Sequence, residues 1–92
     1  MTVQISPKIL DKLKNLNVRI RKSFKERILV FTNNPNDPRL NNHLLRKPYE
    51  GLRSIDITND YRAIYEECQE NGEEIAYFTT LGTHNELYTS GF

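Results

Sequence analysis

The fold is decided by residues 43–65, HLLRKPYEGLRSIDITNDYRAIY. Residues 52–58 and 61–68 are rich in isoleucine, threonine and tyrosine, which favour extended strands. The polar pair Asn59-Asp60 separates the two runs, as a tight turn between paired strands requires. The stretch therefore predicts a β-hairpin.

The register of this hairpin depends on the length of its turn. A two-residue turn would place Ile57 opposite Arg62 and Ile55 opposite Ile64. Both faces of the hairpin would then carry polar and apolar side chains, so the alternation does not indicate which face packs on the core. A shift of register by one residue would exchange all of these neighbours.

A second hairpin follows directly. Asn71-Gly72 is the strongest short signal for a two-residue hairpin turn, and it joins residues 65–70 to a predicted strand over residues 73–81. Gly82 is expected to end that strand, because glycine disfavours the strand interior.

Two helices are predicted before the hairpins and one short element after them. Residues 2–5 alternate polar with apolar and indicate a first strand. Ser6 is a good helix cap and Pro7 suits the first helical position, so a helix follows this strand. A second helix is expected over residues 18–32. Residues 83–88, THNELY, begin with a capping threonine and predict a last turn or short helix.

The order of these elements is β-α-α-β-β-β, which predicts the α+β class. Two N-terminal helices are expected to pack on one face of a small antiparallel sheet and to leave its other face open. A chain of 92 residues is long enough for one hydrophobic core without disulfides or metals. Residues 1–92 are therefore expected to form a single domain.

The net charge of +1 conceals an asymmetry along the chain. Residues 1–53 hold 12 Lys and Arg against 4 Asp and Glu, a net charge of +8, whereas residues 54–92 hold 1 against 8, a net charge of −7. A basic half can follow a phosphate backbone, but basic helices can equally pair with an acidic sheet. Composition alone favours neither interpretation.

Hydropathy and cysteine usage restrict the cellular setting. The longest unbroken apolar run, residues 28–31, is far too short to cross a membrane, and no signal-peptide pattern precedes it. The chain has one cysteine, Cys68, which excludes an internal disulfide. These features fit a reducing cytoplasm, and Cys68 is better described as a small, half-buried strand residue than as a nucleophile.

The side chains that carry chemistry are concentrated in two stretches. Residues 43–65 contain His43, Asp56 and Asp60 with three arginines and a lysine, and the second histidine, His84, lies in LGTHNELY. If the protein has an active site, these two stretches build it. A metal site built from His43, His84 and carboxylates is an alternative, but no ligand spacing indicates one, and no cofactor is expected.

Several motifs resemble the RelE/ParE superfamily of bacterial toxins, and within it the YafQ-like branch. The run NHLLRKPYEGLRSIDITNDYRAIY resembles the central hairpin of that family, with His-x-Leu at its start, Tyr/Trp-x-Gly before the strand and Tyr-Arg-x-Ile-Tyr after the turn. LGTHNELY is similar to the GTH-[SA]-[DE]-L-[FY] segment of the YafQ branch. The order of elements also agrees with a RelE-like fold.

The resemblance implies a function and partners. RelE- and YafQ-like members are ribosome-dependent mRNA endonucleases that a cognate antitoxin neutralises, whereas ParE-like members share the fold and act on gyrase. We therefore expect a cytoplasmic, cofactor-free mRNA interferase with the ribosome, mRNA and an antitoxin as partners. A catalytically blunted module that binds RNA, ribosome or antitoxin is the first alternative, and a ParE-like gyrase inhibitor is the second.

The resemblance also places candidate catalytic residues. His43 corresponds to the family's first active-site histidine and Asp60 to its turn aspartate. Arg62 corresponds to the strand arginine of RelE- and YoeB-like members. His84 corresponds to the C-terminal histidine and Tyr88 to the closing aromatic residue. Asp56 stands where YafQ-like proteins commonly have another histidine. This departure favours the blunted alternative.

RNA cleavage without a metal requires a base for the 2′-hydroxyl proton, an acid for the leaving 5′-oxygen and positive charge on the phosphate. Under the resemblance, His43 and His84 would transfer the protons, in an order left open, and Arg62 would bind the phosphate. Asp56 or Asp60 would orient a histidine or hold the edge of a nucleotide. The alternatives are that Arg62 pairs with the acidic run after it and that Asp60 is an ordinary turn residue.

The remaining candidates would bind RNA. Tyr61, with Tyr88, would stack exposed bases, and Arg53 would assist Arg62 if both lie on one face of the sheet. Tyrosines that alternate on a strand are, however, more often part of a core. The other basic candidates lie before the first hairpin and on the second helix, and they are Arg46, Lys47, Lys22 and Lys25. A solvated surface is the alternative for the two helical lysines.

Overall fold

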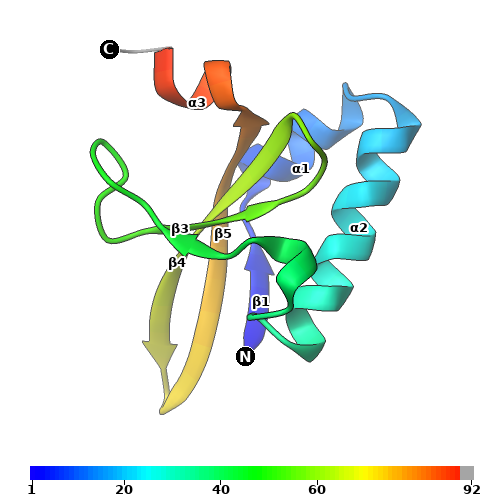
Figure 1. Ribbon diagram of the computed structural model, residues 1–92. Helices are drawn as coiled ribbons and strands as arrows, with labels where there is room; N and C mark the ends of the chain where they lie inside the picture. Colours follow the sequence, from blue (N-terminus) through cyan, green and yellow to red (C-terminus); the bar gives the residue numbers. More distant parts are fainter. Residues whose placement is uncertain (90–92) are drawn as a thin grey trace.

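The computed structural model describes residues 1–89. The elements follow in the order β1 (Thr2–Ile5), α1 (Pro7–Lys14), α2 (Val18–Asn33), η1 (Pro38–Leu40), β2 (His43–Leu44), β3 (Arg53–Asp56), β4 (Tyr61–Glu70), β5 (Glu73–Thr83) and α3 (His84–Thr89) (Figure 1). The predicted α+β class with two N-terminal helices is confirmed. Within this part of the chain, no helix is both long and apolar enough to cross a membrane.

Five strands form one sheet in the order β1-β5-β4-β3-β2. β1 pairs in parallel with β5, and the other neighbouring strands pair antiparallel. The sheet is thus mostly antiparallel. The edge strand β2 and the 3₁₀ helix η1 were not predicted, because segments of two and three residues are too short to show a periodicity.

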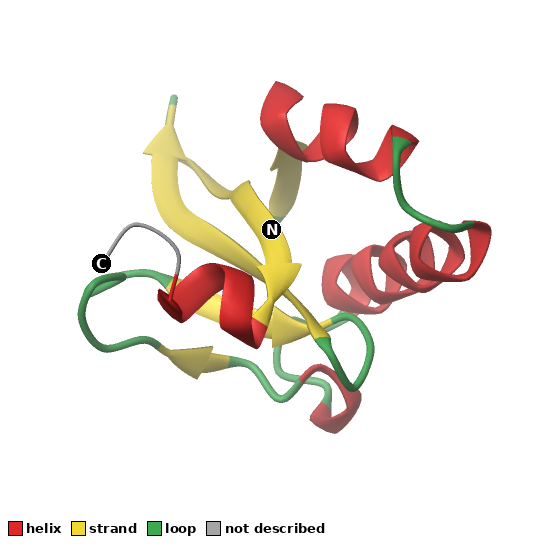
Figure 2. Ribbon diagram, turned by 90° about the horizontal axis from the view of Figure 1, so that it is seen from above, coloured by secondary structure: helices red, strands yellow, loops and turns green. Residues whose placement is uncertain are grey.

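The helices α1 and α2 cover one face of the sheet, and α3 lies on the other (Figure 2). Ser6 begins α1 as predicted, because its Oγ accepts a hydrogen bond from the N–H of Ile9 (3.2 Å) and donates to the carbonyl of Thr79 on β5 (3.1 Å). Asn17 caps α2 in the same way, since its Oδ1 accepts from the N–H of Ile20 (3.0 Å). Both caps satisfy backbone N–H groups at the helix starts, and the bond to Thr79 also ties the start of α1 to β5.

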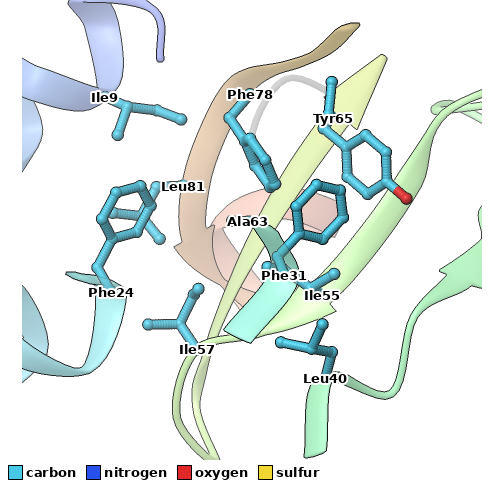
Figure 3. Close-up of a cluster of buried hydrophobic side chains, with 11 residues drawn as sticks. Ile9, Phe24, Phe31, Leu40, Ile55, Ile57, Ala63, Tyr65, Phe78 and Leu81 are labelled. Atoms are coloured by element: carbon cyan, nitrogen blue, oxygen red, sulfur yellow. The ribbon is translucent and has the colours of Figure 1, made fainter. Parts of the chain in front are cut away.

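The main core lies between the two long helices and the sheet (Figure 3). Phe31 of α2 is fully buried, and its ring meets those of Tyr65 (5.0 Å) and Phe78 (5.2 Å) edge to face. The other buried members come from both helices, η1, three strands and the segment after β3, and are Ile9, Phe24, Leu40, Ile55, Ile57, Ala63, Ala76 and Leu81.

The first hairpin has a register one residue away from the predicted one. Arg62 lies opposite Asp56 and not opposite Ile57. The turn is longer than two residues, because the N–H of Ile57 donates to the carbonyl of Tyr61 (2.9 Å) and closes a loop over residues 58–60. Inside the loop, Oγ1 of Thr58 accepts a hydrogen bond from the N–H of Tyr61 (3.0 Å), which stabilises this longer turn.

The second face of the sheet is partly covered, so the prediction that it stays open is wrong in this part. A smaller apolar cluster lies there between the sheet, the loop over residues 45–52 and α3, and it consists of Leu45, Ile64 and Leu87 with Tyr49, Leu52 and Tyr88 against them. β5 continues past Gly82 to Thr83, contrary to prediction. A Cβ on Gly82 would lie 3.3 Å from Cδ2 of Leu87 and 3.3 Å from Oε1 of Glu86, so this glycine permits the close approach of α3.

We expect Phe31→Ala to lower the free energy of unfolding by about 3–5 kcal/mol, because it leaves a cavity between two aromatic rings. Leu29→Ala on the same helix is the matched control, since the Leu29 side chain is 60% exposed, and it should change stability by less than about 0.5 kcal/mol. Urea unfolding of both variants checks this. Equal losses would show that α2 does not pack as described.

Candidate functional site

The helix α3 begins directly where β5 ends, because two reciprocal hydrogen bonds cap it. The N–H of Glu86 donates to Oγ1 of Thr83 (3.2 Å), and the N–H of Thr83 donates to Oε1 of Glu86 (2.8 Å). This arrangement is a capping box, and it places His84 in the first turn of the helix. The predicted short helix is confirmed.

Three rings are in contact at α3, two from the helix and one from the loop over residues 45–52. The exposed ring of His84 lies against Tyr88, with centroids 4.6 Å apart, and Tyr49 meets Tyr88 edge to face at 5.5 Å. The hydroxyl of Tyr49 donates to the carbonyl of Leu87 (2.6 Å), which ties the loop to the helix. Burial, followed by the neighbouring Tyr49, raises the pKa of Tyr88, while the charge of Arg62 opposes this shift. Tyr88 therefore remains a neutral phenol at neutral pH.

Arg62 projects from β4 on the face that carries α3. Its Nε lies 2.9 Å from Oδ1 of Asp56, the residue directly opposite, rather than pairing with the acidic run that follows it. Its Nη1 donates to three backbone carbonyls of the turn, those of Thr58 (2.8 Å), Asn59 (3.0 Å) and Tyr61 (3.1 Å). Oδ1 of Asp56 is buried and accepts no hydrogen bond within the described residues. Its contact with Arg62 is therefore an ion pair without hydrogen-bond geometry.

An open hollow of about 490 Å³ lies between the first hairpin turn and the start of α3. Its lining comes from the turn, the end of β5 and the first turn of α3, and consists of Asn59, Asp60, Tyr61, Thr83, His84 and Asn85. Asp60 and His84, which are far apart in the sequence, therefore share one hollow. Tyr61 also packs against the main core, so only part of its ring is available for a stacking contact.

His43 is exposed on the edge strand β2, opposite Ser54 of β3. Ser54 in turn lies opposite Ile64 of the smaller cluster, so His43 is on the same face as α3. Its Nδ1 lies 2.8 Å from the carbonyl oxygen of Asn41, an arrangement in which Nδ1–H donates. With β3 between them, β2 and β4 are separated by about 10 Å, so His43 and Arg62 lie two strands apart on this face.

Arg53 lies on the opposite face from Arg62, so the condition for its assisting role is not met. It stands opposite Tyr65 of the main core, and its Nε donates to Oδ1 of Asn42 (2.9 Å). Nδ2 of Asn42 donates in turn to the hydroxyl of Tyr65 (2.7 Å). Arg53 therefore belongs to a network that holds the entrance to β2 against the core.

The other basic candidates fall into two groups. Arg46 and Lys47 are exposed in the loop over residues 45–52, which lies on the same side of the sheet as α3 (Figure 1). Lys22 and Lys25 are exposed on α2, which covers the opposite face of the sheet. The structure thus separates the two helical lysines from the histidines.

Three residues that seat α3 were missed by sequence reasoning. Tyr49 stands in a Tyr-x-Gly motif, which is a usable signal. Gly82 in the sequence indicates a strand end, but a glycine in a strand can also mark the close approach of another element. Lys12, whose Nζ lies 3.3 Å from Oε1 of Glu86, gave no signal at all. Within residues 1–89, no group of three or more His, Cys, Asp or Glu side chains is placed to hold a metal ion.

Solved structures of other proteins share this fold. A YoeB/ParE toxin from Agrobacterium tumefaciens matches with a TM-score of 0.71 and 16% identity, over 91% of this chain and 99% of that chain. YafQ from E. coli strain BL21(DE3) matches with a TM-score of 0.65 and 18% identity, over 94% and 96%. A YoeB-YefM complex from Staphylococcus aureus contains a chain that matches with a TM-score of 0.67 and 16% identity, over 91% and 97%. These likenesses confirm the RelE-like fold.

The sequence itself matches a protein family, although no curated protein matches it. The model of that family is described as the ParE toxin of type II toxin-antitoxin system, parDE, and it matches residues 3–88. The matched range includes both hairpins and α3 up to Tyr88. The chain therefore belongs to the ParE toxin family of type II toxin-antitoxin systems, within the RelE/ParE superfamily.

Proposed function

We propose that this toxin is a single-domain, ribosome-dependent mRNA endonuclease of the YafQ-like branch, which works in the cytoplasm without a metal. The observation that carries the proposal is that His43 and the Arg62–Asp56 pair lie on the same face of the sheet as α3, which contains His84. Complexes of E. coli YafQ with DinJ and of S. aureus YoeB with YefM support a cognate antitoxin as the protein partner here.

The proposed reaction is attack of a 2′-hydroxyl on the neighbouring phosphate. One histidine takes the proton of the 2′-hydroxyl, the 2′-oxygen bonds to phosphorus, and the bond to the 5′-oxygen breaks as the second histidine protonates that oxygen. The products are a 2′,3′-cyclic phosphate and a 5′-hydroxyl. His43, whose side chain is exposed, and His84, which lines the hollow, are the two proton carriers.

Arg62 supplies positive charge to the phosphate in this scheme. Because the turn carbonyls hold its Nη1 and Asp56 lies at its Nε, the guanidinium is fixed before substrate arrives. A phosphate would compete with Asp56 for this charge. Asp60, exposed in the hollow beside His84, would orient that histidine or accept a hydrogen bond from a nucleotide.

The RNA strand would follow the loop side of the same face. Arg46 and Lys47 are exposed there and would contact phosphates on either side of the cleaved one. Tyr88 and the exposed part of Tyr61 would stack bases. Lys22 and Lys25, on the far side, would contact the ribosome and not the cleaved strand.

Two specific observations favour other functions. The family model that matches is named after the ParE toxin, and ParE-like members act on gyrase, so this match favours gyrase inhibition. The engagement of Arg62 with Asp56 and three carbonyls favours a blunted module that only binds. Inhibition of gyrase supercoiling with no RNA cleavage would select the first, and tight ribosome binding with no effect on either reaction would select the second.

The proposal is tested with purified ribosomes that carry a defined mRNA. The wild-type chain should cut the mRNA at the ribosomal A site, and His84→Ala should remove cutting because one proton carrier is lost. Stability should hardly change, since the His84 ring is exposed. Gln69→Ala, an exposed change at the distant second hairpin, is the control and should cut normally. Uncut mRNA with a folded wild-type chain would contradict the proposal.

Arg62→Ala should lower the single-turnover rate of bound mRNA by about a hundredfold or more, because a charge that acts on the transition state is lost. Lys22→Ala and Lys25→Ala should do the reverse: they should weaken ribosome affinity, flatten its salt dependence and spare the rate. If Arg62→Ala changes affinity alone, the arginine belongs to the binding surface. Thermal melting separates these effects from loss of the turn that Arg62 also supports.

A further inference from the structure

We propose that Glu86 is a positioning residue, which holds the first turn of α3 and with it the ring of His84 in place for catalysis. The activity part of this inference rests on the proposed function. Its structural part concerns the position of α3 and can be tested without any substrate.

A single carboxylate oxygen joins three elements of the structure. Oε1 of Glu86 accepts a hydrogen bond from the N–H of Thr83 at the end of β5 (2.8 Å). The same oxygen lies 3.3 Å from Nζ of Lys12, which belongs to α1. Since α1 packs on the other face of the sheet from α3, this contact links the two layers around the end of β5. Glu86 therefore fixes α3 both to its own strand and to the helix layer.

The contact lies in a second hollow, separate from the one beside His84. This hollow has a volume of about 330 Å³, and its lining comes from α1, β5, the 45–52 loop and α3. Lys8, Lys12 and Tyr49 are the titratable groups that line it with Glu86. Two lysines face one carboxylate here, so an acidic residue at position 86 matches the local charge.

A helix of six residues is not stable by itself, so contacts with the rest of the protein must fix its position. Its later half is fixed by burial of Leu87 and by the hydrogen bond from Tyr49, while Gly82 leaves room for both Leu87 and Glu86. Its first half carries His84 and is fixed by the Thr83–Glu86 capping box and by Lys12. The distance from His84 to a bound phosphate therefore depends on Glu86.

The electrostatics of the site agree with this geometry. The N–H of Thr83 is the largest cause that lowers the pKa of Glu86, and Lys12 adds to it against the opposing effect of desolvation. A lowered pKa means that the folded state favours the carboxylate, so the cap is retained above that pKa and weakens as pH falls through it. Because the side chains of Lys12 and Glu86 are 31% and 51% exposed, their ion pair should contribute little to overall stability.

The activity test compares four variants of the full chain on ribosomes that carry a defined mRNA. Glu86→Ala should lower the single-turnover rate by about tenfold or more at unchanged affinity, because a small displacement of a catalytic group is costly. Glu86→Gln should restore the rate to within about threefold, since an amide oxygen still accepts the N–H of Thr83. Lys12→Met should also stay within about threefold at neutral pH. Lys14→Met is the matched control, because Lys14 pairs within α1 with Asp11 (3.7 Å), and it should have no effect.

The structural test uses NMR of the same proteins without RNA. In the wild-type chain the ring of Tyr88 lies against that of His84 and shifts its NMR signals. Glu86→Ala should change these His84 signals, and Glu86→Gln should not. Lys12→Met should raise the pKa of Glu86, whereas Lys14→Met should leave it unaltered. The thermal midpoint should be similar in all variants.

Two results would overturn the inference. In an active wild-type background, a Glu86→Ala variant that cleaves at the wild-type rate, or a Glu86→Gln variant as slow as Glu86→Ala, contradicts positioning through the cap. If the wild-type chain does not cleave RNA, the proposed function fails, and the NMR signals decide the positioning claim alone. Unchanged His84 signals in Glu86→Ala would then refute it.

Discussion

The hydrogen bond from the N–H of Ile57 to the carbonyl of Tyr61 sets the register on which the rest of the structure depends. It makes the turn span residues 58–60, and this length directs Ile55 and Ala63 into the main core. Asp56 and Arg62 then face each other on the opposite side of the sheet. In the register of a two-residue turn, Asp56 and Arg62 would lie on opposite faces and one of the two charges would point into the core, so the buried side chains and the turn stabilise the same register.

Much of the fold could be predicted from local patterns. The cap at Ser6, the helical periodicity of α2 and the Asn-Gly turn each specify one element, and each element is present. The turn of the first hairpin could not be predicted in length, because it depends on the hydroxyl of Thr58, which binary patterning ignores. The packing of α3 on the second face could not be predicted either. Gly82 indicates a strand end in the sequence, whereas in the structure it permits the close approach of α3.

The same one-residue shift decides which site predictions agree with the geometry. In the predicted register Arg53 and Arg62 share a face, whereas in the structure Arg53 turns toward Tyr65 and Arg62 toward α3. His43 and His84, the two histidines that the motifs indicated, nevertheless lie on one side of the sheet. The motifs show Asp56 only as a departure from the YafQ-like histidine, whereas in the structure its carboxylate forms an ion pair with Arg62. Tertiary contacts such as Lys12 with Glu86 leave no local pattern and need the structure.

We propose that this sheet face cleaves RNA by proton transfer between two histidines. End-group analysis of mRNA recovered from ribosomes after incubation with the purified toxin decides between this chemistry and others. Attack by the 2′-hydroxyl leaves a 2′,3′-cyclic phosphate on the upstream fragment and a 5′-hydroxyl on the downstream fragment. Fragments with a 3′-hydroxyl and a 5′-phosphate would contradict this proposal, and so would intact mRNA under conditions in which the same protein blocks gyrase.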